Sequence, residues 1–397
     1  MSRPDLVCLA HLRWDWVYQR PQHLMARLAR DRRVFYVEEP IFEGEAEPFT
    51  LVETRAPGVT RIVPWFAEGY GASIEEPVRM VRQAIEEAGV TDPVAWIYAP
   101  TLMPYMDALP APRAVVYDCM DELSAFAGMH DLTGVFRSGR ELLAEEARLL
   151  ELADLVFAGG RSMYEARVDR HDNIHPFPSS VDTDHYRSAT REETEVPDDT
   201  IFGGAPVLGY FGSIDERINL ALLDRVAASH PEWHLVMLGP VNKIDPEALP
   251  RRQNLHYPGF RSYEELPAYL KGWDVCLMPF AMTEATRSIS PTKTLEYLAA
   301  DKPVVSTPVP DVVAEYSGLV AIAETAPEFA SACEKFLGES EEERAARIAR
   351  GREVLSRTSW DATAERMARL VDEAVRARGA DSLARGASRP SGGERVG

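Results

Sequence analysis

Short runs of apolar residues alternate with stretches of helical periodicity along most of the chain. The apolar runs predict strands at Asp5–Ala10, Val34–Glu38, Val94–Tyr98, Ala114–Tyr117, Leu155–Ala158, Val207–Phe211, His234–Leu238, Leu255–Tyr257, Val275–Pro279, Pro303–Ser306 and Leu319–Ile322. The periodic stretches predict helices at Pro21–Ala29, Ile74–Ala88, Val135–Ala153, Leu220–Ser229, Tyr263–Lys271, Pro291–Ala300, Pro327–Leu337, Glu341–Leu355 and Trp360–Arg378. Ser162–Glu165 and Ser262–Glu265 fit the capping-box pattern of a helix start. This alternation predicts an α/β protein with parallel sheets that helices cover on both faces.

A chain of 397 residues is long for one hydrophobic core, so we expect two domains. The alternation breaks at an acidic stretch around Pro197 that ends in Gly203-Gly204. We expect two Rossmann-like domains facing across a cleft, with a helix near the C-terminus that returns towards the first. The expected ranges are 1–190 for the first domain, 191–205 for a linker, 206–358 for the second domain, 359–378 for the returning helix and 379–397 for a disordered tail.

The net charge of −20 disfavours a nucleic-acid partner, which would need a basic face. A local group of arginines could face anionic lipid or simply form a solvated helix face: Arg20, Arg27, Arg30, Arg32 and Arg33. The four cysteines lack metal-site spacing, and Cys8 and Cys276 lie in apolar strands, which is typical of a reducing compartment. No signal peptide or apolar run of about 18 residues is present. We expect a cytoplasmic protein, at most peripheral to the inner face of the membrane.

The segment Ser290–Glu296 has the features of a nucleotide site. Pro291 suits the first position of a helix, with Ser290 as its N-cap and Thr292 in the first turn. The free N–H groups of that turn and the ammonium of Lys293 can bind a phosphate. Glu296 follows on the same face, where a carboxylate can accept hydrogen bonds from ribose hydroxyls. The alternative is that Lys293 and Glu296 form only a surface pair on an amphipathic helix.

The stretch from Ser290 to Val305 resembles the donor-binding signature of the "group 1" glycosyltransferases with the GT-B fold, Pro-x-Lys-x-x-Glu-Tyr-Leu-Ala followed by Pro-Val-Val. The resemblance implies that Glu296 binds the donor ribose and that Lys293 lies by the diphosphate or the sugar. Further matching segments follow the family order, with the first resembling a bacterial subgroup linked to surface polysaccharide assembly: Trp14–Leu24, Ser179–Asp184 and Gly209–Ser213. Many relatives carry a sugar-contacting Glu where Ser288 stands, a role that Glu284 could supply, and a Gly where Asp301 stands.

Further donor contacts are expected in the loop after Val207–Phe211. Its small residues Gly212 and Ser213 let the backbone approach a pyrophosphate, although a glycine after a strand is more often only a turn. Arg217 is the candidate for a second diphosphate cation, or else a solvated arginine at a helix start. Lys243 and Arg287 are the alternates for that role.

The catalytic residues depend on the stereochemical course. A retaining enzyme of this family needs no protein base, because the leaving phosphate can take the acceptor proton. An inverting enzyme would need a base in the first domain, where His11 with Asp121 is the first pair to test, and Asp118 and Glu122 are alternatives that a capping role also explains. Asp182-Thr183-Asp184 matches a metal-binding Asp-x-Asp, but its position after Phe177-Pro178 favours a turn or helix cap.

The leading hypothesis is a glycosyltransferase that moves a sugar from a nucleotide diphosphate-sugar, UDP or GDP being favoured, to a hydroxyl acceptor. We expect no metal and no cofactor, since the nucleotide-sugar is a substrate, and the sequence contains no phosphate-binding loop or dinucleotide motif. A nucleotide-sugar epimerase of the same fold is one alternative. The other is a catalytically silent binding subunit, which the serine at position 288 supports.

Overall fold

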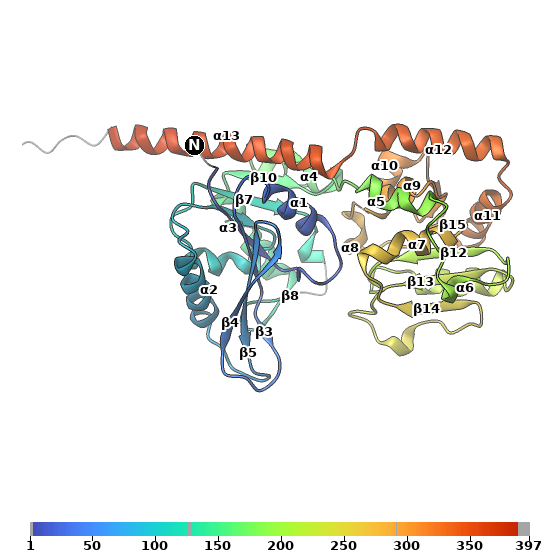
Figure 1. The fold of residues 1–397 in the computed structure, drawn as a ribbon, viewed down its shortest axis with the longest axis horizontal. Coiled ribbons are helices and arrows are strands. Elements are labelled where there is room, and N and C mark those ends of the chain that lie inside the picture. Colours follow the sequence, from blue (N-terminus) through green and yellow to red (C-terminus); the bar gives the residue numbers. More distant parts are fainter. Residues whose placement is uncertain (1–2, 126–128, 291, 388–397) are drawn as a thin grey trace, which may run out of the picture. The chain divides into compact units, whose positions relative to one another are not determined.

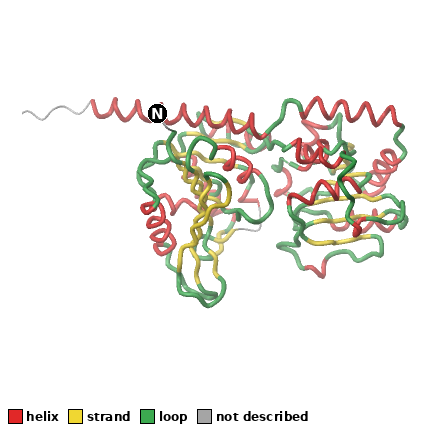
Figure 2. Tube along the Cα trace, viewed as in Figure 1, coloured by secondary structure: helices red, strands yellow, loops and turns green. Residues whose placement is uncertain are grey.

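The structure is a computed structural model that describes residues 3–125, 129–290 and 292–387. The chain divides into two compact units. The first unit comprises Met1–Ala158, Arg167–Pro176 and Ala364–Gly397, and the second comprises Gly159–Ala166 and Phe177–Thr363. Each unit is built around its own sheet, with helices beside it (Figures 1 and 2). The predicted architecture of two Rossmann-like α/β domains is therefore confirmed.

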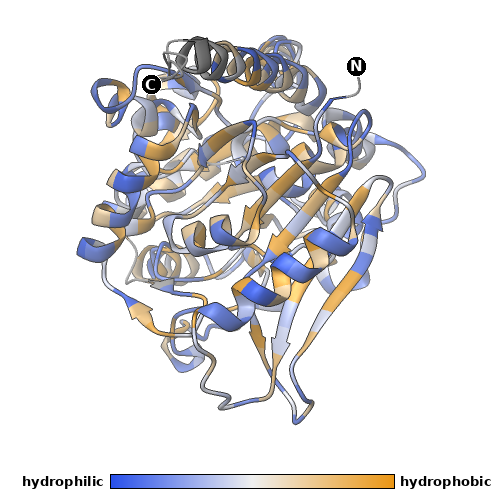
Figure 3. Cartoon of the chain, turned by 90° about the vertical axis from the view of Figure 1, so that its left-hand side faces the viewer, coloured by the Kyte–Doolittle hydropathy of each residue, from blue (hydrophilic) through white to orange (hydrophobic). Residues whose placement is uncertain are grey.

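The first unit contains a mostly parallel sheet. Its strands, in spatial order, are β11 (Ile174–Pro176), β10 (Leu155–Ala158), β7 (Ala114–Cys119), β6 (Val94–Ile97), β1 (Leu6–Ala10), β2 (Val34–Glu38), β5 (Val59–Phe66) and β3 (Ile41–Phe42). The central strand β1 is fully buried, and its Leu6 pairs with Val34 of β2 and Val94 of β6. Figure 3 shows these strands as apolar ribbons, while the helices beside them carry hydrophilic segments. Burial on both faces explains the nearly continuous apolar runs of the sequence.

A long hairpin in the first unit was not predicted from the sequence. Strand β4 (Phe49–Ala56) pairs antiparallel with β5 and projects beyond the rest of the sheet (Figure 1). Gly58, with φ of +77°, forms the turn. The Pro57-Gly58 pair between two runs rich in β-branched and aromatic residues was the available signal for a hairpin.

The helices of the first unit are α1 (Arg20–Leu28), α2 (Glu75–Glu87), α3 (Gly139–Leu152) and α13 (Trp360–Ala387). The Val135–Ala153 prediction began too early, because Phe136–Arg137 forms the short strand β9 before α3. Beyond Ala364, α13 belongs to the first unit, where Asp372 pairs with Arg3 at 2.9 Å. The prediction of disorder from residue 379 is wrong as far as Ala387, where alanine, leucine and arginine favour continuation of the helix. Residues 388–397 lie outside the described residues.

The N-terminal arginines do not form one basic face. Arg20 is buried and pairs with Asp118, while Arg32 is buried beside Asp31. Arg33 pairs with Asp5. Because Arg20 and Arg32 are buried, the lipid-facing and the solvated-face interpretations are both wrong for these two residues, whereas Arg33 is exposed and fits a solvated face.

The second unit contains a six-stranded parallel sheet. Its strands, in spatial order, are β14 (Leu255–Gly259), β13 (His234–Leu238), β12 (Val207–Phe211), β15 (Val275–Met278), β16 (Val304–Ser306) and β17 (Ala321–Ile322). Its longer helices are α6 (Leu220–Ser229), α7 (Leu266–Gly272), α9 (Lys293–Ala299), α10 (Pro310–Tyr316), α11 (Ala326–Leu337) and α12 (Glu341–Leu355). Gly209 of β12 lies against the buried Trp273 ring, and a Cβ there would come within 1.9 Å of it.

The boundary between the units differs from the predicted one. Residues 177–205, which include the expected linker, belong to the second unit, since α5 (Thr183–Arg187) packs against α7 and α9. The short helix α4 (Arg161–Glu165) also belongs there, because Asp311 of α10 accepts hydrogen bonds from the N–H groups of Arg161 and Ser162, both at 3.1 Å. Ser162 is therefore not a capping-box residue, whereas Ser262 forms the predicted capping box.

All four cysteines are buried and free, which agrees with their apolar surroundings. Among the helices of the described residues, none combines the length and apolar character needed to span a bilayer.

Candidate functional site

Gly212 and Lys293 come together at the carboxyl end of β12. Gly212 directly follows the strand with φ of +135°, and a Cβ there would lie 2.5 Å from Lys293 Cε and 2.8 Å from Nζ. The Lys293 ammonium lies 5.6 Å from the centre of the Tyr210 ring. Burial lowers the pKa of Lys293, while neighbouring Glu296 raises it. Because a side chain at residue 212 would collide with the end of the Lys293 side chain, the ammonium can lie here only if residue 212 is glycine.

Helix α9 is fixed to the sheet by two of its other side chains. The Tyr297 hydroxyl accepts a hydrogen bond from the backbone N–H of Phe211 at 3.2 Å, and Thr294 contacts Met278 Sδ at 3.4 Å. These contacts join α9 to the ends of β12 and β15. They hold the predicted pair Lys293 and Glu296 at the edge of the sheet where open α/β folds bind ligands.

Glu296 is a buried carboxylate with one unused oxygen. The residue is 9% exposed and hydrogen-bonds Tyr186 and Thr292. Its Oε2 atom is buried, with no hydrogen-bond partner among the described residues. Burial raises the pKa of Glu296, and Lys293 opposes that rise. A buried acceptor without a donor is costly, so this oxygen is suited to a ligand hydroxyl. The surface-pair alternative for Lys293 and Glu296 does not fit this burial.

Arg217 is held in an ion pair near the lysine. Its guanidinium meets Asp215, with Nη2 2.6 Å from Oδ2, and its charge also lowers the pKa of Lys293. Ser213 accepts a hydrogen bond at its carbonyl from the Tyr210 hydroxyl at 3.0 Å. Arg217 is thus a partly buried arginine that Asp215 holds in position near Lys293, and its role as a second diphosphate cation stays a prediction.

The start of α9 differs from the prediction. The helix begins at Lys293, and its N-cap is Thr292 without a side-chain cap hydrogen bond. Ser290 is therefore not the N-cap; it lies against Gly160, where a Cβ would be 2.8 Å from Ser290 Cβ. Pro291 lies outside the described residues. Lys293 is thus the first residue of helix α9.

The two positions that depart from the family signature, Ser288 and Asp301, lie before and after helix α9. Ser288 follows the short helix α8 (Glu284–Arg287), whose Glu284 is exposed and pairs with Arg287 at 3.3 Å. Asp301 ends the turn after α9 with φ of +57°, and it pairs with Arg352 at 2.6 Å. The conformation explains a glycine in relatives, and Asp tolerates it here. Lys243, the alternate cation, is exposed after β13.

The carboxylates proposed as bases have different surroundings. Asp118 is fully buried, and its carboxylate accepts hydrogen bonds from Nε and Nη2 of Arg20, the latter at 2.7 Å. Glu122 pairs with Arg167 at 2.6 Å. These ion pairs give both residues structural roles. His11 follows β1 and Asp121 follows β7, and β6 lies between these two strands, which separates their ends by roughly 10 Å.

Glu39 is a functional candidate that the sequence analysis missed. It follows β2 directly, and its Oε1 atom is buried without a hydrogen-bond partner among the described residues. The pKa of Glu39 is raised to about 8, mainly by burial; the charge of Arg13 opposes this rise, and Glu38 and Asp131 contribute to it. Its position directly after a buried strand was the only available signal.

Asp182 is a helix cap, as predicted. Its carboxylate accepts a hydrogen bond from the N–H of His185 at 3.2 Å and so begins α5. Helix α5 in turn supplies Tyr186, the partner of Glu296 that the sequence analysis did not identify. No group of three or more His, Cys, Asp or Glu within the part of the chain that the structure describes has the arrangement of a metal site.

Comparison with known proteins shows what the second unit is similar to. Residues 205–339 match the family "Glycosyl transferases group 1", a range that contains both Gly212 and Glu296. A "putative teichuronic acid biosynthesis glycosyltransferase TuaH" of Bacillus subtilis is 27% identical over 258 residues. That match covers 60% of this chain and 62% of the relative, less than two thirds of its length.

Solved structures share the fold at low sequence identity. A sucrose-phosphate synthase from Thermosynechococcus elongatus aligns with a TM-score of 0.70 and 14% identity, covering 94% of this chain and all of the other. HepE from Anabaena, in complex with UDP and glucose, aligns with a TM-score of 0.63 and 15% identity. The alignment covers 92% of this chain and 99% of HepE.

Proposed function

We propose that this chain is a glycosyltransferase of the group 1 kind with the GT-B fold, and that it transfers a sugar from a nucleotide diphosphate-sugar to a hydroxyl acceptor. The observation that carries the proposal is the buried, unpartnered Oε2 of Glu296 one helical turn from Lys293. A neutral ribose hydroxyl would satisfy this oxygen. The ammonium and the Gly212 loop then remain for the diphosphate.

We favour UDP or GDP as the nucleotide, because both present two ribose hydroxyls to the Glu296 carboxylate. UDP is the stronger candidate, since the related fold of HepE was solved with UDP. The teichuronic acid biosynthesis named for the Bacillus subtilis relative supports a glycan or lipid-linked acceptor.

The proposed reaction breaks the bond between the anomeric carbon and the diphosphate oxygen, and the acceptor oxygen forms a new bond to that carbon. The acceptor proton goes to the departing diphosphate in a metal-independent, retaining course. Lys293, with Arg217 nearby, would stabilise the negative charge that develops on that leaving group. An inverting course would instead require a base such as Asp121 or His11 in the first unit.

A catalytically silent binding subunit is the second candidate, and a specific observation favours it. Ser288 stands where relatives carry a sugar-contacting glutamate, and the nearby Glu284 is exposed and paired with Arg287. Such a subunit would bind a nucleotide-sugar without consuming it. An epimerase would convert the nucleotide-sugar without any acceptor.

The test combines binding with turnover. Thermal shifts with UDP-, GDP- and dTDP-sugars identify the donor, because a ligand of the folded state raises its apparent stability. Lys293→Ala should remove the shift, while Lys335→Ala, an exposed lysine on α11, should keep it. Release of nucleoside diphosphate only when acceptor glycans are added supports the transferase. Product formation from the nucleotide-sugar alone supports the epimerase, and binding without consumption supports the silent subunit.

A further inference from the structure

A cavity of about 380 Å³ opens in the first unit, beside the carboxyl end of β2. Its lining residues are Arg13, Asp15, Trp16, Pro40, Ile41, Phe42, Glu43 and Arg61. This volume falls within the range of small-molecule sites, about 300–1,000 Å³. The cavity takes Asp15 and Trp16 from the Trp14–Leu24 segment that the sequence analysis singled out.

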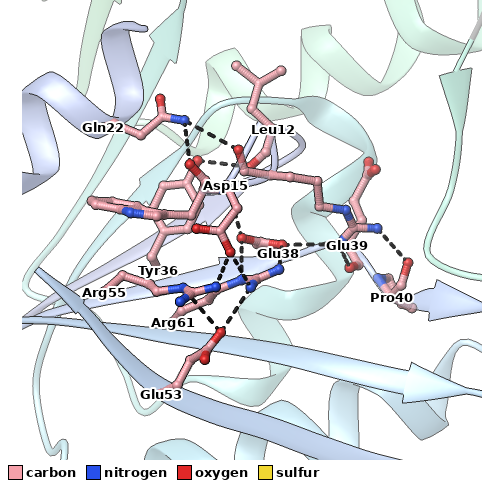
Figure 4. Close-up of polar contacts among 12 residues, drawn as sticks. Leu12, Asp15, Gln22, Tyr36, Glu38, Glu39, Pro40, Glu53, Arg55 and Arg61 are labelled. Carbon is pink, nitrogen blue, oxygen red and sulfur yellow. Dashed lines mark hydrogen bonds and ion pairs between the residues drawn. The ribbon is translucent and has the colours of Figure 1, made fainter. Parts of the chain in front are cut away.

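The polar side of the cavity is a fixed ion network centred on Arg61 (Figure 4). The Arg61 guanidinium meets Glu38 at 2.7 Å, Asp15 at 3.0 Å and Glu53 at 2.9 Å. Arg55 also meets Asp15 and Glu53. Because each group has partners from several elements, the network holds the Asp15 carboxylate at the cavity in a defined position.

Hydrogen bonds and an ion pair also fix the position of the segment after β1. Arg13 donates to the Pro40 carbonyl at 2.8 Å and meets Glu38 at 3.3 Å. Gln22 donates to the Trp14 carbonyl at 3.1 Å, and the Trp14 N–H donates to Glu38 at 2.8 Å. The backbone around Trp16 is thereby positioned before any ligand arrives, which lowers the cost of binding.

The charges around the cavity leave no excess of positive charge. The cations Arg13, Arg55 and Arg61 face the carboxylates Glu38, Asp15 and Glu53, and Glu43 adds a further acid to the lining. An anionic ligand would therefore find every nearby guanidinium already paired. The carboxylates and guanidinium groups still offer acceptors and donors to a neutral ligand rich in hydroxyls.

The apolar side of the cavity consists of aromatic and aliphatic surface. Trp16 is 46% exposed, although it lies beside buried charged groups, and Phe42 and Ile41 complete this side. A sugar ring has a polar edge and an apolar face of C–H groups. An indole face beside planar carboxylates and guanidinium groups complements both surfaces.

We propose that this cavity binds a neutral sugar ring of the acceptor, with that ring stacked on Trp16 and its hydroxyls bonded to Asp15, Glu43 and Arg13. The inference rests on the proposed function, since it assigns the acceptor of that transfer to the carbohydrates. It adds a site in the first unit that is separate from the residues around Lys293.

Saturation-transfer NMR on the full chain tests the site with methyl β-glucoside, methyl β-galactoside and N-acetylglucosamine as neutral probes, and glucuronate as the anionic probe. We expect transfer to at least one neutral sugar, weaker transfer to glucuronate, and about a five- to tenfold loss of affinity in Trp16→Ala. Phe136→Ala removes an aromatic residue of the same unit that is 53% exposed and outside the cavity lining, and it should change nothing.

UDP and GDP binding to the same samples separates this inference from the proposed function. Nucleotide binding without transfer to any neutral sugar overturns the sugar site and leaves the donor site standing. Transfer that persists in Trp16→Ala, or that is stronger for glucuronate, also overturns it. Failure of both nucleotides to bind overturns the donor assignment instead. Thermal unfolding of each variant confirms that it is folded.

Discussion

The Lys293 side chain lies directly over the Cα of Gly212, so that a methyl group at Gly212 would overlap both Cε and Nζ. A glycine loop after one strand and a lysine on a helix some eighty residues later thus form one surface. The glycine is required twice, for its φ of +135° and for the space that the ammonium occupies.

Gly212→Ala should therefore displace Lys293 and weaken nucleotide diphosphate binding. We expect about a tenfold or greater loss of affinity, because a hydrogen bond to a charged group contributes about 1.5–3 kcal/mol. Isothermal titration calorimetry with UDP and GDP measures it. Gly318→Ala, at a glycine of the same unit with open space around it, is the control and should bind as wild type. Equal affinities in the two variants would contradict the shared surface.

Tyr186→Phe tests whether the hydroxyl of α5 positions the Glu296 carboxylate. Loss of one hydrogen bond should weaken nucleotide binding by about 0.5–1.5 kcal/mol, or roughly two- to twelvefold. Tyr164→Phe on α4 is a control in the same unit. An unchanged affinity in Tyr186→Phe would mean that Glu296 holds its position through Thr292 and Lys293 alone.

The sheets could be predicted from the sequence because their strands are buried on both faces. Val34–Glu38, Leu155–Ala158 and Val207–Phe211 have the predicted bounds, since continuous apolar runs end where burial ends. The β4–β5 hairpin was missed because β4 is exposed or only partly buried along its whole length, so its sequence contains no continuous apolar run. The boundary between the units was misplaced because contacts distant in sequence, such as Asp311 with Ser162, decide it.

The candidate site was predictable only where one segment holds several of its groups. Lys293 and Glu296 share a helix, and their spacing already suggested a common face. Tyr186 and Glu39 could not be identified in this way, because their importance comes from tertiary burial. Arg20 and Asp118, which are 98 positions apart, looked like a surface cation and a candidate base until the fold paired them.

Asp311 should contribute to the stability of the second unit. The residue is 2% exposed and accepts from two backbone N–H groups at the start of α4. Asp311→Ala removes this cap, and we expect a loss of about 1–2 kcal/mol in the free energy of unfolding by urea. Asp224→Ala, which removes an exposed ion pair with Arg252, should cost less than about 1 kcal/mol. Equal losses in the two variants would rule out the capping role.

Glu39 should make stability depend on pH. Its pKa of about 8 in the folded state exceeds the value of about 4.3 for an unfolded chain, so the folded protein binds the extra proton between these values. Its favourable contribution is complete below pH 4 and is lost as the pH rises to 8. Glu39→Gln should flatten the decline of unfolding free energy between pH 5 and 8, whereas the exposed-residue control Glu47→Gln should not. Parallel profiles for wild type and Glu39→Gln would contradict the buried carboxyl.

The most direct test of the central claim compares UDP and GDP with their 2′,3′-dideoxy forms by calorimetry on wild type and Glu296→Ala. If Glu296 Oε2 accepts from the ribose, wild type should prefer the hydroxylated nucleotide by about 1–3 kcal/mol, and Glu296→Ala should lose that preference. Glu342→Ala, an exposed glutamate on α12, should keep it. The same preference in Glu296→Ala as in wild type would contradict the account, because the ribose hydroxyls would then be recognised elsewhere.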